Sequence, residues 1–313
     1  MAAWKVLLTD GLEENGQAIL RQSAQVDDRS GISPEELLQV IGEYDAIIVR
    51  GRTKVTPAVF AAASKLKVVG RAGVGVDNID LAAAKEHKVT VVNSPMATTV
   101  AVAELTMGLM LSLIRDIPRA DAGLKSGNWL KKELRGVELF QKTLGVIGFG
   151  RIGASVAQRA AAFEMKVIAY DPALPAGEIK KRGGEPVTLD QLLAQSDFIT
   201  LHIPLTADSK SLLNEAAFGK MKKGVRIVCA ARGGVIDEAA LLAALESGKV
   251  AGAALDVYTA EPPGKTPLTD HPKVVGTPHI GAETVEAQAR AAVDISNEVV
   301  AALKGESLRW RVA

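Results

Sequence analysis

An arginine, a glutamate and a histidine in this sequence could together carry chemistry, because each lies just after an apolar segment. Arg232 is followed by two glycines, Glu261 by two prolines, and His279 follows Pro278, which restricts the backbone before it. An arginine can anchor a carboxylate and polarise a carbonyl group, a histidine carries a proton near neutral pH, and a carboxylate can orient the imidazole. These are the groups that hydride transfer to or from a hydroxy acid requires.

Each of the three residues has a structural alternative that the sequence leaves open. His279 could be a core histidine bonded to the backbone, and Glu261 an ordinary loop carboxylate before a turn. Arg232 could be a surface residue beside the helix that Asp237 and Glu238 would open.

A glycine motif indicates a second kind of site. An apolar strand pattern at 143–148 is followed by Gly148, Gly150 and Gly153, then a helix pattern, then a second strand that ends on Asp171. This order is typical of a dinucleotide site, in which the glycines permit a tight turn, close approach to a pyrophosphate and close helix packing. The helix N-terminus would supply N–H groups for the phosphates. The alternative is a glycine-rich turn between two core elements.

The position of Asp171 predicts which dinucleotide is bound. A carboxylate at the end of the second strand can accept hydrogen bonds from the adenosine ribose, and it would repel a 2′-phosphate. The sequence therefore predicts NAD rather than NADP as cofactor.

The elements that must position these residues alternate between strands and helices. Helix patterns lie between the first strands at 13–23, 34–44, 57–63 and 81–86, the second opened by Ser33 as N-cap and Pro34. Strand patterns occur at 4–9, 46–50, 68–70 and 89–93, and six more at 145–148, 167–171, 198–202, 225–229, 251–257 and 274–277. This alternation predicts an α/β fold with two doubly wound parallel-sheet domains, a Rossmann-type NAD domain and a flavodoxin-like substrate domain.

The same patterns predict the domain boundaries. We expect a substrate-binding domain formed by residues 1–97 and 284–313, and an NAD-binding domain formed by residues 98–283. A final helix at 284–304 is expected to pack back on the first domain. The stretch 115–138, which contains prolines and glycines, is interpreted as an irregular connection.

Composition limits the classes of function. The chain has 313 residues, enough for two domains, and Lys+Arg 37 nearly balances Asp+Glu 36, which gives no indication of nucleic acid or an anionic membrane as partner. One cysteine, Cys229, excludes an internal disulfide framework, and no metal-ligand cluster is apparent. The most apolar stretch, 100–114, is interrupted by Glu104 and is too short to span a membrane. We expect this stretch to form a buried helix.

The sequence also leads to expectations about location and assembly. We expect a cytoplasmic protein without a signal peptide. We also expect a homodimer or larger homo-oligomer.

Several motifs together resemble the D-isomer-specific 2-hydroxyacid dehydrogenases. They are the glycine motif at 148–153, Tyr170-Asp-Pro172, the segment 231–237, the segment 256–263 and Pro278-His-Ile-Gly-Ala282. The resemblance implies that Arg232, Glu261 and His279 are the catalytic set, with His279 taking the hydroxyl proton and Glu261 steadying the imidazolium. The cofactor-binding residues expected from the motif and the resemblance are Val74, Gly148, Gly150, Arg151, Ile152, Gly153, Asp171, Pro172, His202, Ile203, Pro204, Ala230, Ala231, Arg232, Asp256, His279, Gly281 and Ala282.

Two segments of the first domain indicate which members of the family, and therefore which substrate, the chain resembles most. The segments 49–55 and 69–78 are similar to those of family members that oxidise 3-phosphoglycerate to 3-phosphohydroxypyruvate, the entry step to serine. In that scheme the N–H groups of Val74 and Gly75 hold the substrate carboxylate, and Arg232 and His279 also contact the substrate. Cations for the phosphate would come from Arg50, Arg52, Lys54 and Arg71, and from Lys131, Lys132 or Arg135 of a neighbouring subunit, although any of them could be a solvated surface charge.

Two departures and two alternatives remain open. Cys229 and Thr98 stand where the family commonly has asparagine, which could change the loop that holds Arg232 and the fit of the substrate. A glyoxylate or hydroxypyruvate reductase would use the same residues for another substrate. A dinucleotide-sensing binding protein, like a corepressor, could use the same fold but would not require the complete catalytic set.

Overall fold

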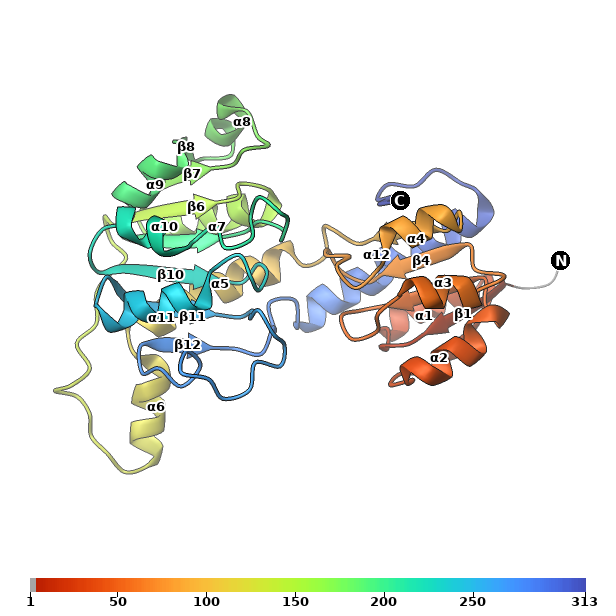
Figure 1. Cartoon of the computed structure of the whole chain (residues 1–313), viewed down its shortest axis with the longest axis horizontal. Coiled ribbons are helices and arrows are strands. Elements are labelled where there is room, and N and C mark those ends of the chain that lie inside the picture. Colours follow the sequence, from red (N-terminus) through yellow and green to blue (C-terminus); the bar gives the residue numbers. More distant parts are fainter. Residues whose placement is uncertain (1–3) are drawn as a thin grey trace. The chain divides into compact units, whose positions relative to one another are not determined.

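The structure, a computed structural model, describes residues 4–313 and divides into two compact units (Figure 1). The first unit consists of the chain up to Thr98 together with Ala282–Ala313, and the second consists of Thr99–Gly281.

The first unit is a parallel sheet of five strands in the order β2-β1-β3-β4-β5, the order of flavodoxin-like folds. Its strands are β1 (Trp4–Leu8), β2 (Ala24–Asp28), β3 (Ala46–Val49), β4 (Val68–Arg71) and β5 (Thr90–Asn93). Its helices are α1 (Glu14–Arg21), α2 (Pro34–Val40), α3 (Pro57–Ala62), α4 (Leu81–Glu86) and α12 (Val285–Lys304), with a 3₁₀ helix at Ile41–Glu43.

Both faces of this sheet are covered, so its central strand β3 consists of apolar residues throughout. Leu7 of β1 packs into one layer, whereas Val6 and Leu8 pack into the other. In this second layer Ile295 and Val299 of the last helix, α12, join them. The end of the chain therefore completes a core that its beginning starts, and Figure 1 shows α12 (blue) beside β4 and α1 (orange and red).

Helix starts follow local capping chemistry. The hydroxyl of Ser33 accepts a hydrogen bond from the N–H of Glu36 at 3.1 Å, and Pro34 occupies the first helical position, which confirms the predicted start of α2. Thr284 caps α12 in the same way, through the N–H of Ala287 at 3.1 Å.

The second unit is a parallel sheet of seven strands in the order β12-β11-β10-β9-β6-β7-β8, an extended Rossmann order. Its strands are β6 (Thr143–Ile147), β7 (Lys166–Tyr170), β8 (Glu185–Pro186), β9 (Phe198–Leu201), β10 (Val225–Cys229), β11 (Val250–Leu255) and β12 (Val274–Gly276). Its helices are α5 (Thr99–Ile114), α6 (Ile117–Lys125), α7 (Arg151–Ala162), α8 (Ala176–Lys181), α9 (Leu189–Gln195), α10 (Glu215–Lys220) and α11 (Glu238–Glu246). The two sheets and their orders confirm the predicted fold class.

The order of the second sheet creates a switch point between β6 and β9, from which the chain winds in opposite directions. Ligands of open parallel sheets bind beyond the carboxyl ends of the strands at such a point. The glycine motif follows β6 directly, so the topology brings the predicted dinucleotide loop to this place.

Three sequence predictions were wrong in detail. The stretch 115–138 is not irregular throughout, because α6 occupies Ile117–Lys125 with Pro118 in its first turn, where proline is tolerated. The strand Ala24–Asp28 was missed because it is a polar edge strand. The second sheet has seven strands rather than six, since two-residue β8 adds an edge.

No helix in the described part of the chain is both long and apolar enough to cross a membrane.

Candidate active site

The three glycines after β6 meet three different steric demands. Gly148 has φ of +87°, and a Cβ there would lie 2.5 Å from the carbonyl oxygen of His202. A Cβ on Gly153 would lie 2.1 Å from the oxygen of Gly148, so helix α7 packs closely on the turn. A Cβ on Gly150 would meet nothing within 4 Å. The loop is therefore tight at its ends and open at its middle glycine, which fits a pyrophosphate approaching the backbone there.

The N-terminus of α7 adds N–H groups to this loop. Gly150 is the N-cap and provides no capping side chain, and Arg151 and Ile152 are the first residues of the helix. Twelve residues of aligned peptide dipoles end at this point, which favours a negatively charged group. The residues present thus fit the phosphates of a dinucleotide.

Asp171 lies directly after β7 and supports the same loop. One carboxylate oxygen accepts the N–H of Phe149 at 2.8 Å, and the other accepts the N–H of Ala173 at 2.9 Å. The side chain therefore holds the glycine loop against the end of the neighbouring strand. Each oxygen retains a further acceptor position, which a ribose hydroxyl could use. Pro172, which follows, is exposed.

The segment after β9 forms the other wall of the glycine turn. The Cγ2 atom of Ile203 would lie 2.6 Å from a Cβ on Gly148, so the two segments are in close contact. The Nε2 atom of His202 is 3.0 Å from the hydroxyl of Thr200, whereas its buried Nδ1 atom has no hydrogen-bond partner among the described residues. Burial lowers the pKa of His202 to about 3, so this imidazole is neutral. Pro204 follows on the same segment.

The predicted catalytic residues follow three adjacent strands. Arg232 comes after β10, Glu261 after β11 and His279 after β12, and these strands are neighbours in the sheet. All strands are parallel, so the three loops leave the same edge. The structure brings Glu261 and His279 into contact: Nδ1 of the imidazole lies 2.7 Å from a carboxylate oxygen.

This contact defines the roles that the two side chains can take. The carboxylate favours a proton on Nδ1, so Nε2 is left to give or take a proton. The other oxygen of Glu261 accepts the N–H of Tyr258 at 3.1 Å, which fixes the carboxylate. The His279 side chain is 49% exposed, so it is not the core histidine that the sequence left as an alternative.

The backbone of His279 is held in an unusual conformation by Asp256. The φ of His279 is +55°, a left-handed value that a non-glycine residue adopts only at a cost. Asp256 is 1% exposed, and its carboxylate accepts the N–H of Ile280 and of Gly281, each at 2.8 Å, and the hydroxyl of Thr277 at 2.6 Å. Asp256 was predicted from the family resemblance as a cofactor contact, which stays a prediction; the structure shows that its carboxylate positions the His279 loop.

Arg232 is partly buried, and one of its Nη atoms donates to the carbonyl of Ala231 at 2.6 Å. A Cβ on the next residue, Gly233, would lie 1.7 Å from the oxygen of Tyr258, so the arginine loop and the Glu261 loop touch closely. Ala230 and Ala231 are buried in this loop. Burial raises the pKa of Cys229, at the end of β10, to about 11, so its thiol is neutral.

In the first unit, the Val74–Gly75 loop is suited to an anion. The carbonyl of Val74 accepts the side-chain amide of Asn93 at 2.7 Å, whereas within residues 4–313 the N–H groups of Val74 and Gly75 have no hydrogen-bond partner. The Arg71 side chain lies over Gly73 and donates to the carbonyl of Ala72 at 2.8 Å.

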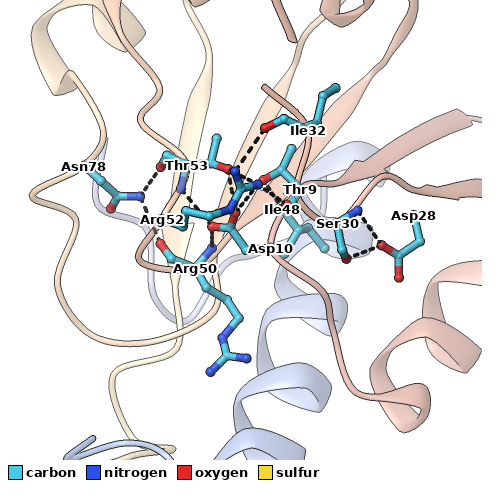
Figure 2. A network of polar contacts seen from close by, with 10 residues as sticks. All are labelled: Thr9, Asp10, Asp28, Ser30, Ile32, Ile48, Arg50, Arg52, Thr53 and Asn78. Carbon is cyan, nitrogen blue, oxygen red and sulfur yellow. Dashed lines mark hydrogen bonds and ion pairs between the residues drawn. The ribbon is translucent and has the colours of Figure 1, made fainter. Parts of the chain in front are cut away.

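The four cations predicted in the first unit differ in orientation. Arg52, whose side chain is 48% exposed, is engaged by its own loop: it donates to the carbonyls of Thr9 and Ile32 at 2.6 and 3.0 Å and lies 3.1 Å from the carboxylate of Asp10 (Figure 2). Arg50 points away from this network (Figure 2). Lys54 is exposed, as are Lys131, Lys132 and Arg135 of the second unit. Arg52 is therefore committed to holding the loop.

Sequence reasoning missed Asp10, Asn78 and Glu283, which surround Arg50. Asp10 comes two residues after β1, so the strand-end rule applied to the second unit could have found it in the first. Ala282 begins the segment of the first unit that contains Glu283. Among the described residues, no group of three or more His, Cys, Asp or Glu side chains could hold a metal ion.

The chain is similar to known proteins of one family. Residues 107–281 match the model of the family described as D-isomer specific 2-hydroxyacid dehydrogenase, NAD binding domain. The chain is 50% identical over 304 residues to D-3-phosphoglycerate dehydrogenase 2, chloroplastic, of Arabidopsis thaliana, covering 96% of this chain and 49% of the relative. It is 49% identical over 303 residues to D-3-phosphoglycerate dehydrogenase of Methanocaldococcus jannaschii, covering 96% of this chain and 58% of the relative.

The same similarity extends to solved structures. The crystal structure of a glyoxylate reductase from Paecilomyes thermophila has a TM-score of 0.91 and 32% identity, over 100% of this chain and 99% of that one. The chain thus matches a whole solved structure, whereas it spans only about half the length of the two curated relatives.

Proposed function

Because the chain belongs to the D-isomer specific 2-hydroxyacid dehydrogenases, we propose that it oxidises D-3-phosphoglycerate to 3-phosphohydroxypyruvate with NAD. The observation that carries the proposal is the 2.7 Å contact between His279 and Glu261 on the sheet edge that also presents Arg232. A binding protein that only senses a dinucleotide would not require this pair.

The chain's own residues perform the proton chemistry in this proposal. Nε2 of His279 removes the proton of the C2 hydroxyl, and the carboxylate of Glu261 stabilises the imidazolium that forms. The guanidinium of Arg232 binds the substrate carboxylate and polarises the oxygen on C2 as it becomes a carbonyl. When the rate is measured in the reverse direction, the same imidazole returns the proton.

The cofactor of this family fits the second unit. NAD, when bound, accepts the C2 hydrogen with its electron pair at the nicotinamide ring. The open glycine loop and the N-terminus of α7 would hold the pyrophosphate, and Asp171 the ribose. The carboxylate of Asp171 supports a preference for NAD over NADP, because a 2′-phosphate would bring two like charges together.

The substrate's phosphate would be bound by cations of the first unit. Arg50 and Arg71 are the guanidinium groups proposed for it, and Lys131 is proposed to act on a neighbouring subunit's substrate. The N–H groups of Val74 and Gly75 supply further donors for the carboxylate. High identity to two D-3-phosphoglycerate dehydrogenases supports this substrate over others.

A substrate panel tests the proposal directly. NAD reduction is followed at equal concentrations of D-3-phosphoglycerate, D-glycerate, D-lactate and glycolate, and NADH oxidation with glyoxylate and hydroxypyruvate. We expect the highest kcat/KM with D-3-phosphoglycerate. A higher kcat/KM with glyoxylate or hydroxypyruvate would instead make the protein a reductase like its structural neighbour.

We also propose that the protein is a homodimer or larger homo-oligomer. Ile117, Leu124 and Trp129, on and after α6, are 49%, 63% and 79% exposed, which is unusual for large apolar side chains in a monomer. Light scattering after size-exclusion chromatography measures the mass, and a single-chain mass would refute this. The single thiol, Cys229, supports a cytoplasmic location.

A further inference from the structure

Arg50 of the first unit already has an anionic partner within the chain. Its Nη2 atom lies 2.6 Å from a carboxylate oxygen of Glu283, and the two side chains are 26% and 49% exposed. The residues are 233 positions apart in sequence, so the contact depends on the fold. The guanidinium that is proposed to bind the substrate's distal anion is therefore occupied by a carboxylate.

The backbone of Arg50 is clamped from two sides. One oxygen of Asp10, whose side chain is 4% exposed, accepts the N–H groups of Arg50 and Thr53 at 2.7 and 3.1 Å. The amide of Asn78 donates to the carbonyls of Arg50 and Thr53 at 2.9 and 2.6 Å (Figure 2). Because the backbone N–H and carbonyl groups of Arg50 and Thr53 are both satisfied by these side chains, the backbone of the loop is fixed, and a change of partner at Arg50 involves its side chain alone.

The two arginines of this loop differ in their partners. The guanidinium of Arg52, although its side chain is 48% exposed, donates to two backbone carbonyls and lies beside Asp10, whereas that of Arg50 extends away from this network (Figure 2). The guanidinium of Arg50 is instead paired with the carboxylate of Glu283.

Glu283 is fixed at its base but exposed at its tip. It directly precedes Thr284, the N-cap of α12, and Gln288 of that helix donates to the carbonyl of Ala282 at 2.8 Å. Among the described residues, the carboxylate has one other hydrogen-bond donor nearby, the Gln288 amide at a long 3.4 Å. The main interaction of the Glu283 carboxylate is thus with Arg50, and an anion that binds Arg50 more strongly could displace this carboxylate.

We propose that Glu283 is a specificity-determining residue: it is an internal counter-ion that the distal anionic group of the substrate must displace from Arg50. This rests on the proposed function only in naming that anion as a phosphate. A phosphate brings more charge and more acceptor oxygens than a carboxylate, so it can replace Glu283, and a neutral group has no means of doing so. Glu283 acts through Arg50 and touches no reacting atom.

The variant Glu283→Gln removes the charge and keeps the shape. An exposed ion pair is worth little, so we expect the KM for D-3-phosphoglycerate to fall about two- to fivefold. The kcat and the KM for NAD should stay within about twofold, because the charge is lost at the substrate's distal end. Glu286→Gln is the matched control, since Glu286 is an exposed glutamate on the first turn of the same helix, and it should leave all three values unchanged.

Coupling to Arg50 is tested by a double-mutant cycle. Arg50→Met should raise the KM for D-3-phosphoglycerate, and Glu283→Gln in the Arg50→Met background should have no further effect. A second readout needs no turnover: inorganic phosphate should raise the unfolding temperature of Glu283→Gln more than that of the wild type, and this excess should vanish in the double variant.

The outcomes separate this inference from the proposed function. If D-3-phosphoglycerate is oxidised but the KM of Glu283→Gln is unchanged or higher, the inference is overturned and the proposed function stands. The inference is also overturned if Glu286→Gln gives the same fall, or if the effect persists without Arg50. Another outcome is that D-3-phosphoglycerate is not oxidised while inorganic phosphate still raises the unfolding temperature of Glu283→Gln more than that of the wild type, with no excess in the double variant. In that case the inference stands and the proposed substrate is wrong.

Discussion

His202, a half-buried residue whose imidazole Nδ1 atom is fully buried, should make the second unit sensitive to acid. Its pKa is about 3 in the folded chain because its Nδ1 atom is buried without a partner, against about 6.5 in an unfolded chain. Below about pH 6.5 the His202 imidazole binds a proton in the unfolded state but not in the folded state. The stabilisation is therefore complete above about pH 6.5 and is lost as the pH falls toward about 3.

The size of the effect follows from the linkage relation. Between the two pKa values each pH unit removes about 1.4 kcal/mol of unfolding free energy, which amounts to about 2 kcal/mol between about pH 7.5 and about pH 5. The variant His202→Gln cannot take up the proton, so this part of the pH dependence should disappear. Other groups that titrate in this range contribute equally to both proteins and cancel in the comparison.

Urea unfolding followed by circular dichroism measures the difference. We expect the free energy of unfolding of the wild type to fall by about 2 kcal/mol more than that of His202→Gln over this range. His271→Gln is the matched control for the removal of an imidazole from the same unit, because His271 lies on a surface turn and its Nδ1 atom accepts the N–H of Lys273. Parallel curves for wild type and His202→Gln would refute the idea that this imidazole is neutral because it is buried.

The other predictions concern the active site and the glycine loop. His279→Ala should lower kcat by about 10²-fold or more while the Kd for NAD, measured by fluorescence titration, stays the same; normal turnover would remove His279 from the mechanism. Asp171→Ala should raise the ratio of kcat/KM with NADP to that with NAD, and an unchanged ratio would contradict its ribose role. Gly150→Ala should fold normally but bind NAD more weakly, since its Cβ would enter the open space, whereas Gly153→Ala should lower the unfolding temperature because its Cβ meets the Gly148 oxygen. Equal behaviour of the two alanine variants would show that the loop is not open at Gly150.

The fold was predictable where local patterns and burial agree. A buried strand such as β3 is a continuous apolar run between polar segments, so its position and length can be read directly. The strand β2 could not be found in this way, because its residues Ala24–Asp28 are mostly polar and pair with one neighbour only. Edge strands of this kind are stabilised by the sheet beside them rather than by their own composition.

The site was predictable through topology rather than spacing. Glu261 and His279 are 18 residues apart, and no local rule joins them. The expectation of parallel strands placed both at one sheet edge, and the family resemblance paired them. What could not be predicted was the use of side chains to hold backbone: Asp10 and Asp256 bind N–H groups that are far away in sequence, and such contacts exist only after the chain has folded.

The return of the last helix to the first unit has a consequence for how the protein is made. Ile295 and Val299 complete one layer of the first core, and Gly70 is small because a Cβ there would lie 2.7 Å from Val299. As the ribosome delivers the chain from its N-terminus, the first strands emerge early but must wait for α12, while the whole of Thr99–Gly281 is already available to fold. The unit that is synthesised first is thus the unit that is finished last. Until α12 is made, one face of its sheet is only half covered, and a chaperone would have to shield this apolar surface during synthesis.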